Sequence, residues 1–337
     1  MNKRPSRQLF EKIYTQLKGI PDIWVKRDSN LSSLTTFKIG GDARLWIAPL
    51  SVDALVSCLG LLKDNEIDFH ILGGGSNVII SDHGVDCVLD TRGLAWIKSI
   101  GEGQYEVGAG FSLKRLVALS VKNGLSGCEG LAGIPGSVGG AIAMNAGGKN
   151  VAIGDLVTHL LIADSGGTRW IPREKVQFGY RKCVIEDRSF NSTLNTQNSK
   201  LLMERSFNST LNTQNSKLII AGARISLQKS RERIVRDYVL SIMDRRKKTQ
   251  PLGKPSAGCI FKNPRSTPAG KLIEMAGLKG MQCGGAAVSV KHANFIVNLD
   301  RARAQDVVDL IKRVREKVFE NFNVLLEPEV KTMGVSL

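Results

Sequence analysis

Residues 130–148 read GLAGIPGSVGGAIAMNAGG, with seven glycines among nineteen residues. The other positions are mostly small and apolar, whereas a flexible linker would be polar and rich in glycine and serine. We expect five apolar side chains of this stretch to be buried: Leu131, Ile134, Val138, Ile142 and Met144. Dense glycine beside a core marks backbone at positive φ or backbone that another group approaches closely. Because exposed N–H groups in such turns form anion sites, the stretch predicts a loop around a large phosphate-bearing ligand. The alternative is a tightly packed turn between core elements.

A second glycine turn, GGGSN at residues 73–77, lies between the apolar runs 70–72 and 78–80. This is not the dinucleotide fingerprint, in which G-x-G-x-x-G opens a helix, because residues 78–80 are typical of a strand. Three consecutive glycines suit a backbone cradle for a pyrophosphate, and Ser76 and Asn77 add side-chain donors. Together the two glycine stretches predict one long ligand held at two points.

The composition restricts the class of protein. A chain of 337 residues has room for two or three domains. The six cysteines show no C-x-x-C spacing and the four histidines are scattered, so we expect neither a metal site nor a disulfide framework. The charged N-terminus has no apolar signal-peptide core, and no apolar run is long enough to span a bilayer. We therefore expect a cytoplasmic protein without membrane insertion.

The formal net charge of +16 is compatible with nucleic acid, a membrane surface or anionic small ligands as partners. The densest basic run is residues 245–248, and no recognisable nucleic-acid module is present. We expect anionic nucleotide ligands and no nucleic acid; a solvated basic surface is the alternative.

The order of apolar patterns predicts a small α/β unit, then strands with glycine turns, then a βαβ-like end. Residues 1–30 are expected to form a short helix and a loop. Residues 157–171 are typical of a hairpin with its turn at 164–167. A helix is expected over 232–248, with one apolar face made of Ile234, Val235, Tyr238, Val239 and Ile242. Residues 324–330 are expected to form the closing strand.

A direct repeat interrupts this order. The fourteen letters of residues 188–201 recur at 205–218, a period of seventeen residues. Two copies do not make a solenoid, and the polar composition offers little to bury. We interpret the repeat as a tandem duplication in a surface loop or disordered insert.

Eight short motifs occur in an order that resembles a known family, the UDP-N-acetylenolpyruvoylglucosamine reductases of bacterial cell-wall synthesis. The resemblance covers nearly the whole chain except the duplicated insert. The matching stretches are residues 36–41 (TFKIGG), 72–78 (LGGGSNV), 130–141 (GLAGIPGSVGGA), 145–147 (NAG), 178–181 (FGYR), 256–264 (SAGCIFKNP), 288–298 (VSVKHANFIVN) and 326–330 (LEPEV).

The resemblance implies an α+β fold. A two-part FAD-binding domain of the vanillyl-alcohol-oxidase (PCMH) type, residues 1–91 and 92–221, precedes a smaller α/β substrate-binding domain, residues 222–337. It also implies an NADPH-dependent flavoprotein oxidoreductase, with FAD and NADPH as cofactors. The substrate would be UDP-N-acetylglucosamine enolpyruvate and the product UDP-N-acetylmuramate, a peptidoglycan precursor. A monomer is expected.

The implied chemistry needs three side chains. Hydride from the reduced flavin N5 adds to the enolpyruvyl methylene carbon, and negative charge then spreads into the carboxylate. A fixed cation must meet that charge, and Arg181 matches the family's position for it. Without the resemblance, we would interpret the Tyr-Arg pair as the exposed end of a surface strand. Glu329 matches the family's carboxylate, with Glu327 as the fallback.

Cys259 matches the proton donor, where the best-known members of the family carry serine. A free thiol titrates near ~8.5, far below an alcohol, so it is mostly protonated at neutral pH and is the better acid. We expect a substitution that preserves function; the alternative is a buried structural cysteine.

The resemblance also assigns binding residues. Four residues are candidates for the sugar and diphosphate of the substrate, together with the rest of the basic run 245–248: Tyr180, Lys248, Lys262 and Asn263. The FAD set consists of the glycine turns and their neighbours: Ile39, Gly40, Gly41, Gly73, Gly74, Gly75, Ser76, Asn77, Gly133, Ile134, Pro135, Gly136, Ser137, Gly139, Gly140 and Asn145.

Two other functions stay open at this point. Another flavin oxidoreductase of the same fold, such as a sugar-lactone oxidase, would bind FAD but ignore a UDP-sugar; residues 259–264 and Glu329 argue against it. A non-enzymatic nucleotide- or RNA-binding protein rests on charge alone and would bind nucleic acid in a strongly salt-dependent way.

Overall fold

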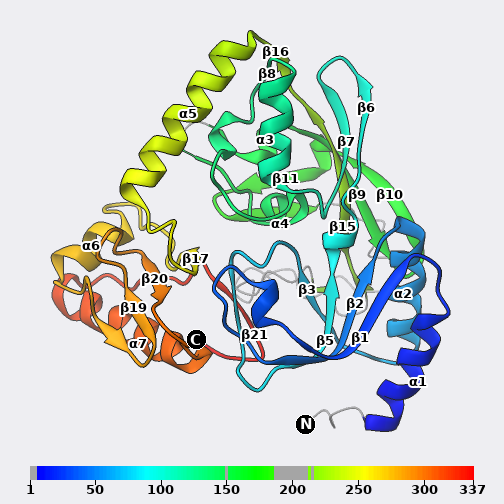
Figure 1. Ribbon diagram of the computed structural model, residues 1–337, viewed down its shortest axis with the longest axis horizontal. Helices are drawn as coiled ribbons and strands as arrows, with labels where there is room; N and C mark the ends of the chain where they lie inside the picture. Colours follow the sequence, from blue (N-terminus) through cyan, green and yellow to red (C-terminus); the bar gives the residue numbers. More distant parts are fainter. Residues whose placement is uncertain (1–5, 149–150, 186–211, 214–215) are drawn as a thin grey trace, which may run out of the picture.

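The computed structural model describes residues 6–148, 151–185, 212–213 and 216–337 (Figure 1). Most of the duplicated segment 188–218 lies outside the described residues, so the interpretation of the repeat stays a prediction. None of the helices in these ranges has the length and apolar character that a bilayer crossing requires.

The first unit is a four-stranded sheet in the order β1-β2-β5-β3. Its strands are β1 (Ile23–Asn30), β2 (Asp42–Pro49), β5 (Val85–Asp90) and β3 (His70–Leu72). Two helices accompany it, α1 (Arg7–Lys18) and α2 (Val52–Asp64). Ser51 caps α2, since its side chain accepts a hydrogen bond from Ala54 N at 3.2 Å.

The expectation of a loop before residue 30 was wrong, because β1 pairs with β2 from Ile23 to Asn30. Most side chains of β1 are exposed. An edge strand of this kind carries no alternating apolar signal, and only its long-range pairing with β2 reveals it.

The second unit is an antiparallel five-stranded sheet in the order β10-β9-β15-β7-β6. Its strands are β10 (Gly167–Pro172), β9 (Val157–Asp164), β15 (Ile219–Ser226), β7 (Gln104–Gly108) and β6 (Ile97–Gly101). The expected hairpin is confirmed, because Gly167 pairs with Asp164 across its turn. Helices α3 (Leu113–Lys122) and α4 (Val138–Ala143) belong to the same unit.

Strand β15 crosses the expected domain boundary between residues 221 and 222, because it pairs with both β7 and β9. The boundaries therefore do not coincide with the sheets, and the division of the chain into domains stays a prediction. Three small pairs complete the strands of this region: β11 (Val176–Gly179) with β12 (Lys182–Ile185), β8 (Leu125–Ser126) with β16 (Gln228–Lys229), and β13 (Asn212–Thr213) with β14 (Ser216–Lys217).

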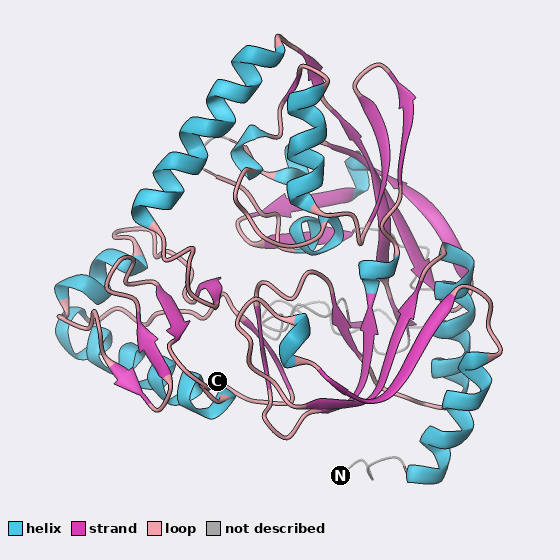
Figure 2. Cartoon of the chain, in the orientation of Figure 1, coloured by secondary structure: helices cyan, strands magenta, loops and turns pink. Residues whose placement is uncertain are grey.

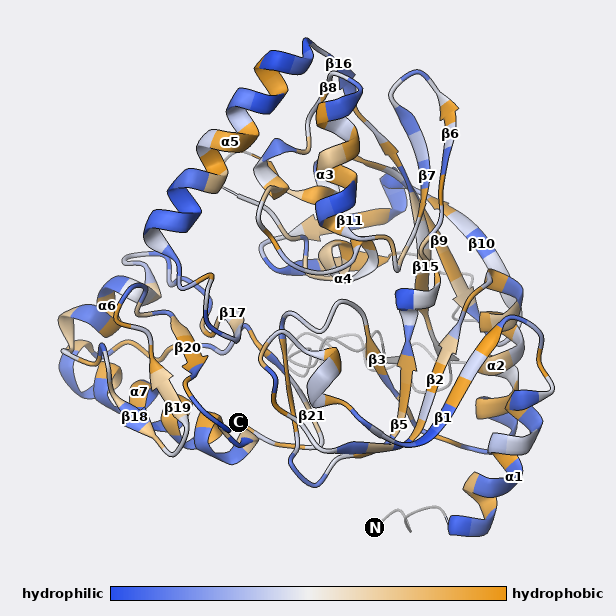
Figure 3. Ribbon diagram, viewed as in Figure 1, coloured by the Kyte–Doolittle hydropathy of each residue, from blue (hydrophilic) through white to orange (hydrophobic). Residues whose placement is uncertain are grey.

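Helix α5 (Glu232–Thr249) leads from the second unit to the last one (Figure 1). Val235 and Ile242 are buried as expected, but Ile234 and Tyr238 are 58% and 45% exposed, so the expected apolar face was too wide. Figure 3 shows mostly hydrophilic colour along this helix, interrupted by apolar turns. A single buried stripe is enough for a helix that lies on the surface.

The last unit is a four-stranded antiparallel sheet in the order β17-β20-β19-β18. The expected βαβ-like order was therefore wrong, because a βαβ unit joins parallel strands. Figure 2 shows its helices beside these short strands. The strands are β17 (Ser256–Cys259), β20 (Phe295–Asn298), β19 (Ala286–Val288) and β18 (Gln282–Cys283), and the helices are α6 (Ala269–Met275) and α7 (Ala304–Phe322).

The chain then returns to the first unit. The expected strand at 324–330 was wrong: these residues make one isolated bridge, Phe261 to Pro328. The strand is β21 (Lys331–Met333), which runs parallel to β4 (Val78–Ile80). This pairing places the last strand of the chain beside β4, the strand that directly follows the glycine turn of residues 73–77.

Candidate active site

Arg181 lies at the tip of the β11–β12 hairpin, where Gly179 and Lys182 pair on either side of the turn. Its backbone is left-handed, with φ of +56°, a conformation that a non-glycine residue adopts at a cost. Its Nε atom lies 2.5 Å from Glu329 Oε1, close enough for an ion pair but without the alignment of a hydrogen bond. The hairpin therefore presents the expected cation to the expected carboxylate.

Glu329 is 8% exposed, and its backbone N–H donates to Ile260 O at 2.7 Å, one residue after Cys259. Burial raises the pKa of this carboxyl, and the positive charges of Arg181, Lys262 and Lys331 oppose the rise. Glu327, the fallback, is half exposed and its Oε2 accepts from Lys262 Nζ at 3.1 Å. The structure thus brings Glu329, not Glu327, to Arg181.

Cys259 ends strand β17 and pairs with Phe295 of β20. Burial raises the pKa of its thiol to about 12; the charge of Glu329 adds to the rise, and Arg181 and Arg246 reduce it. The thiol is therefore protonated across the neutral range and lies within the electrostatic reach of both expected partners.

Arg246, which lies within the expected basic run 245–248, is a fourth member of this group. Its Nε is buried without a hydrogen-bond partner among the described residues, which costs free energy unless a ligand supplies an acceptor. Its pKa is lowered, first by burial and then by Arg245 and Arg181. A Cβ at Gly133 would lie 2.8 Å from Arg246 Cδ, so Arg246 also contacts the glycine stretch. Its position inside the 245–248 run was the only available signal.

The two glycine turns meet, as the prediction of one ligand held at two points requires. A Cβ at Gly74 would lie 2.4 Å from Gly136 Cα, and Ser76 Oγ donates to Pro135 O at 2.9 Å. Gly136 has φ of +124°, which favours glycine. At Gly74 the group that approaches closely is the chain's own backbone, as the packed-turn alternative expects, and the loop around a phosphate-bearing ligand stays a prediction.

The remaining glycine-stretch residues divide between core and surface. Leu131, Val138 and Ile142 are buried as expected, whereas Ile134 and Met144 are only half-buried. The prediction of five buried side chains was thus right at three positions. Half-buried Ile134 and exposed Pro135 lie in the part of the loop that meets the Gly73–Gly75 turn.

Residues 39–41 have structural contacts of their own. Ile39 is 3% exposed, and a Cβ at Gly41 would lie 2.3 Å from Asp82 O. In the same motif, Thr36 Oγ1 donates to Ser256 O at 2.7 Å and Ser256 N donates back to Thr36 O. This motif therefore fixes the start of the strand that carries Cys259.

The side chain of Asn77 is engaged as well. Its Nδ2 donates to Glu329 O at 3.3 Å, and Lys331 N donates to Asn77 O. The residue expected at the pyrophosphate thus also ties the glycine turn to the backbone of the expected catalytic carboxylate.

Three of the four expected substrate-binding residues lie together. Tyr180 is adjacent to Arg181, and its hydroxyl accepts from Asn263 N at 3.2 Å. Lys262 precedes Asn263 and has Glu327 as an ion-pair partner. Lys248 does not join them: its side chain is 72% exposed and pairs with Asp244 on the same helix. Helical geometry separates it from Arg246, since residues two apart point to different sides.

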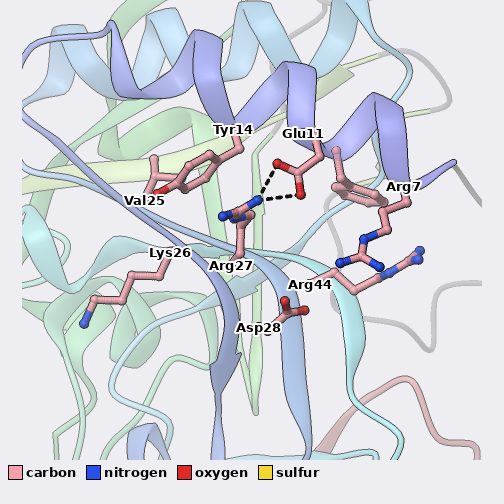
Figure 4. A pocket seen from close by; sticks show the side chains of 9 residues that line it. Arg7, Glu11, Tyr14, Val25, Lys26, Arg27, Asp28 and Arg44 are labelled. Atoms are coloured by element: carbon pink, nitrogen blue, oxygen red, sulfur yellow. Dashed lines mark hydrogen bonds and ion pairs between the residues drawn. The ribbon is translucent and has the colours of Figure 1, made fainter.

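Other cavities and clusters do not compete with this site. A hollow of about 740 Å³ lies between α1 and the β1–β2 strands (Figure 4), and it contains none of the expected residues. Two of its arginines have carboxylate partners: Arg27 pairs with Glu11, and Arg44 lies 3.3 Å from Asp86. Within the described ranges, no group of three or more potential ligands could hold a metal ion.

Comparison with known proteins shows which family models and which relatives this chain matches. Residues 250–333 match the family model of the UDP-N-acetylenolpyruvoylglucosamine reductase C-terminal domain, and residues 43–171 match an FAD binding domain. The chain is 38% identical to the UDP-N-acetylenolpyruvoylglucosamine reductase of Syntrophobacter fumaroxidans (94% of this chain, 85% of the relative). It is 37% identical to the Bacillus subtilis protein of the same name (96% of this chain, 99% of the relative).

A solved structure agrees. The Thermus caldophilus UDP-N-acetylenolpyruvylglucosamine reductase superimposes with a TM-score of 0.73 at 30% identity, over 92% of this chain and 99% of that one. The expected fold, an FAD-binding part followed by a smaller α/β part, is thereby confirmed. The chain belongs to the UDP-N-acetylenolpyruvoylglucosamine reductase family.

Proposed function

We propose that the chain reduces UDP-N-acetylglucosamine enolpyruvate to UDP-N-acetylmuramate, with FAD and NADPH as cofactors, in peptidoglycan precursor synthesis. One observation supports it above the rest. In a chain of this family, Arg181, Glu329, Cys259 and Arg246 converge beside a pair of glycine turns. Neither a sugar-lactone oxidase nor a nucleic-acid-binding protein has comparable support.

The glycine turns fit FAD. Gly74 and Gly136 bring two turns into contact, and N–H groups in glycine turns of this kind can hold a pyrophosphate. The residues that would hold FAD are those of the turns 73–77 and 133–140, together with residues 39–41. FAD, once bound and reduced by NADPH, supplies a hydride.

The protein's own residues handle the charge and the proton. Arg181, held beside Glu329, is placed to meet negative charge as it develops on the substrate carboxylate. The Cys259 thiol, protonated because of its raised pKa, is placed to deliver a proton to the adjacent carbon. An enolate is a strong base, so a weakly acidic thiol suffices.

Substrate binding is assigned to Tyr180, Lys262, Asn263 and Arg246, with Arg246 in place of Lys248. The buried, unpaired Nε of Arg246 calls for an anionic or carbonyl oxygen, and a guanidinium suits phosphate or carboxylate. We also propose the division 1–91, 92–221 and 222–337, with β15 and β21 as shared strands. NADPH and a nucleotide-linked sugar fit a cytoplasmic enzyme, and a monomer stays a prediction.

The test is substrate-dependent NADPH oxidation. Purified protein supplied with FAD is mixed with NADPH, with and without UDP-N-acetylglucosamine enolpyruvate, and the product is weighed by mass spectrometry. We expect oxidation that depends on this substrate and a product heavier by two hydrogens. Oxidation at the same rate without the substrate, or an unchanged mass, would remove the assignment.

A further inference from the structure

We infer that Asn145 is a positioning residue for Arg181, linking the glycine stretch to the hairpin that carries the arginine. This inference rests on the proposed function for its kinetic consequence, but its structural consequence can be measured without it. The sequence assigned Asn145 to the cofactor.

The contacts of its side chain join three segments. Asn145 Nδ2 donates to Gly179 O at 3.0 Å, and Gly154 N donates to Asn145 Oδ1 at 3.1 Å. Gly179 is the last residue before the Tyr180-Arg181 turn. The amide therefore fixes the carbonyl that immediately precedes the turn.

The local backbone is built for this contact. Asn145 follows α4 in a left-handed conformation, with φ of +40°, which asparagine tolerates better than most residues. A Cβ at Gly154 would lie 2.8 Å from Asn145 Oδ1 and 2.6 Å from Phe178 Cγ. Only glycine at 154 lets the amide and the hairpin approach as they do.

The hairpin depends on such attachments because β11 and β12 form a two-stranded sheet of their own. An isolated pair of this kind is marginally stable. Phe178 packs against the core of the second unit, and Asn145 holds the next residue. Figure 1 shows β11 beside α4, the helix that precedes Asn145. Without the amide, the hairpin would lose the hydrogen bond to the carbonyl that immediately precedes the Tyr180-Arg181 turn.

The first experiment measures the two halves of the reaction separately, in anaerobic single turnovers. Asn145→Ala removes both hydrogen bonds. Asn145→Asp keeps an acceptor for Gly154 N but removes the donor to Gly179 O, and it provides a test if the alanine variant does not fold. Asn123→Ala is the matched control, an asparagine at the end of α3 whose Nδ2 donates to Tyr105 Oη instead.

We expect both Asn145 variants to slow reoxidation of the reduced flavin by the enolpyruvyl substrate by about 100-fold, the effect of a displacement of roughly 1 Å. Flavin reduction by NADPH and FAD content should each change less than about twofold, because the substitutions displace only Arg181 and leave the cofactor site in place. In an Arg181→Ala background, Asn145→Ala should have no further effect, because residues that act through one another are non-additive. Multiplying effects, or loss of FAD in place of slow reoxidation, would overturn the inference.

The second experiment needs no activity. Hydrogen exchange of the peptide spanning residues 176–185 is followed in the protein without substrate. Asn145→Ala and Asn145→Asp should raise exchange in this hairpin, whereas Asn123→Ala should not. Unchanged exchange would overturn the positioning role. Failure of the wild-type protein to reoxidise with substrate would instead remove the proposed function and leave this measurement valid.

Discussion

The Cys259 thiol lies between two opposing influences. Burial and the charge of Glu329 raise its pKa to about 12, while Arg181 and Arg246 pull it down. The net effect keeps the proton on sulfur far above the range where an exposed thiol would lose it. A serine hydroxyl in the same place would also stay protonated, which explains why the two residues are compatible with one role.

Replacing Cys259 with Ala should leave flavin reduction by NADPH nearly intact and slow reoxidation by the substrate at least about 100-fold, the lower range of general acid catalysis. Cys259→Ser should keep much of the rate, since it keeps a donor. Stopped-flow absorbance of the flavin measures both steps. An alanine variant with normal turnover would show that Cys259 is not the acid.

The pH dependence follows from the direction of the shift. The thiol is needed protonated, and its raised pKa keeps it so, so reoxidation should show no loss near pH ~8.5, where a free thiol titrates. The rate should decline only as the pH approaches about 12. A wild-type rate that falls near pH ~8.5 while the Cys259→Ser rate does not would contradict the raised pKa of the Cys259 thiol.

Arg246 and Lys248 provide a matched pair of cations on one helix. Arg246→Ala should lower kcat/KM by roughly 10- to 100-fold, the equivalent of a charged hydrogen bond of about 1.5–3 kcal/mol. Lys248→Ala removes only an exposed pair with Asp244 and should change kcat/KM less than about twofold, as for other exposed pairs. Steady-state kinetics at varied substrate concentration measure kcat/KM for both variants. An equal loss of kcat/KM in the two variants would show that Lys248 also belongs to the site.

Among the secondary-structure elements, α7 shows how the last unit is fastened to the first. Asp82, between β4 and β5, accepts hydrogen bonds from Ala304 N at 2.9 Å and Gln305 N at 3.3 Å. A carboxylate from another unit therefore caps the first turn of α7. Its negative charge also interacts favourably with the positive end of the helix dipole.

Asp82→Ala should lower stability by about 1 kcal/mol, the usual cost of losing a helix cap. Asp86→Ala is the control, because its exposed pair with Arg44 should contribute well under about 1 kcal/mol. Urea unfolding followed by circular dichroism compares the two. Equal midpoints for both variants would show that the cap contributes nothing to the attachment.

Elements with a strong periodic signal could be predicted from sequence. Helix α5 and the β9–β10 hairpin were expected with nearly the observed bounds. Strands β1 and β21 were not, because an exposed edge strand and a three-residue strand depend on partners distant in sequence. Within the basic run 245–248 the sequence did not single out Arg246, because the burial that distinguishes its side chain from that of Lys248 depends on tertiary packing.

At the scale of the whole molecule, three units meet where their loops converge. The motif of residues 36–41 holds β17, Asn77 holds Glu329, and the hairpin tip brings Arg181 to the same place. The family motifs gave these residues from sequence, but not their contacts. Several of them contact one another, which their spacing in the sequence does not show.

The role of the duplicated segment 188–218, which lies mostly outside the described residues, stays a prediction. Deleting residues 188–204, one period of seventeen, leaves one complete copy and should change kcat/KM less than about twofold, because polar sequence with little to bury contributes little to a core. Steady-state turnover and the thermal midpoint of the deletion variant measure this. A large loss in either would show that the second copy contacts the site or the fold.

The central claim is tested most directly by a visible absorption spectrum of the protein in an anaerobic cuvette, taken before and after NADPH and then after the enolpyruvyl substrate. We predict a flavin band that bleaches with NADPH and returns when the substrate is added. A band that bleaches but does not return would contradict the substrate assignment. The lack of any band after FAD is added would contradict the glycine-turn site on which the assignment rests.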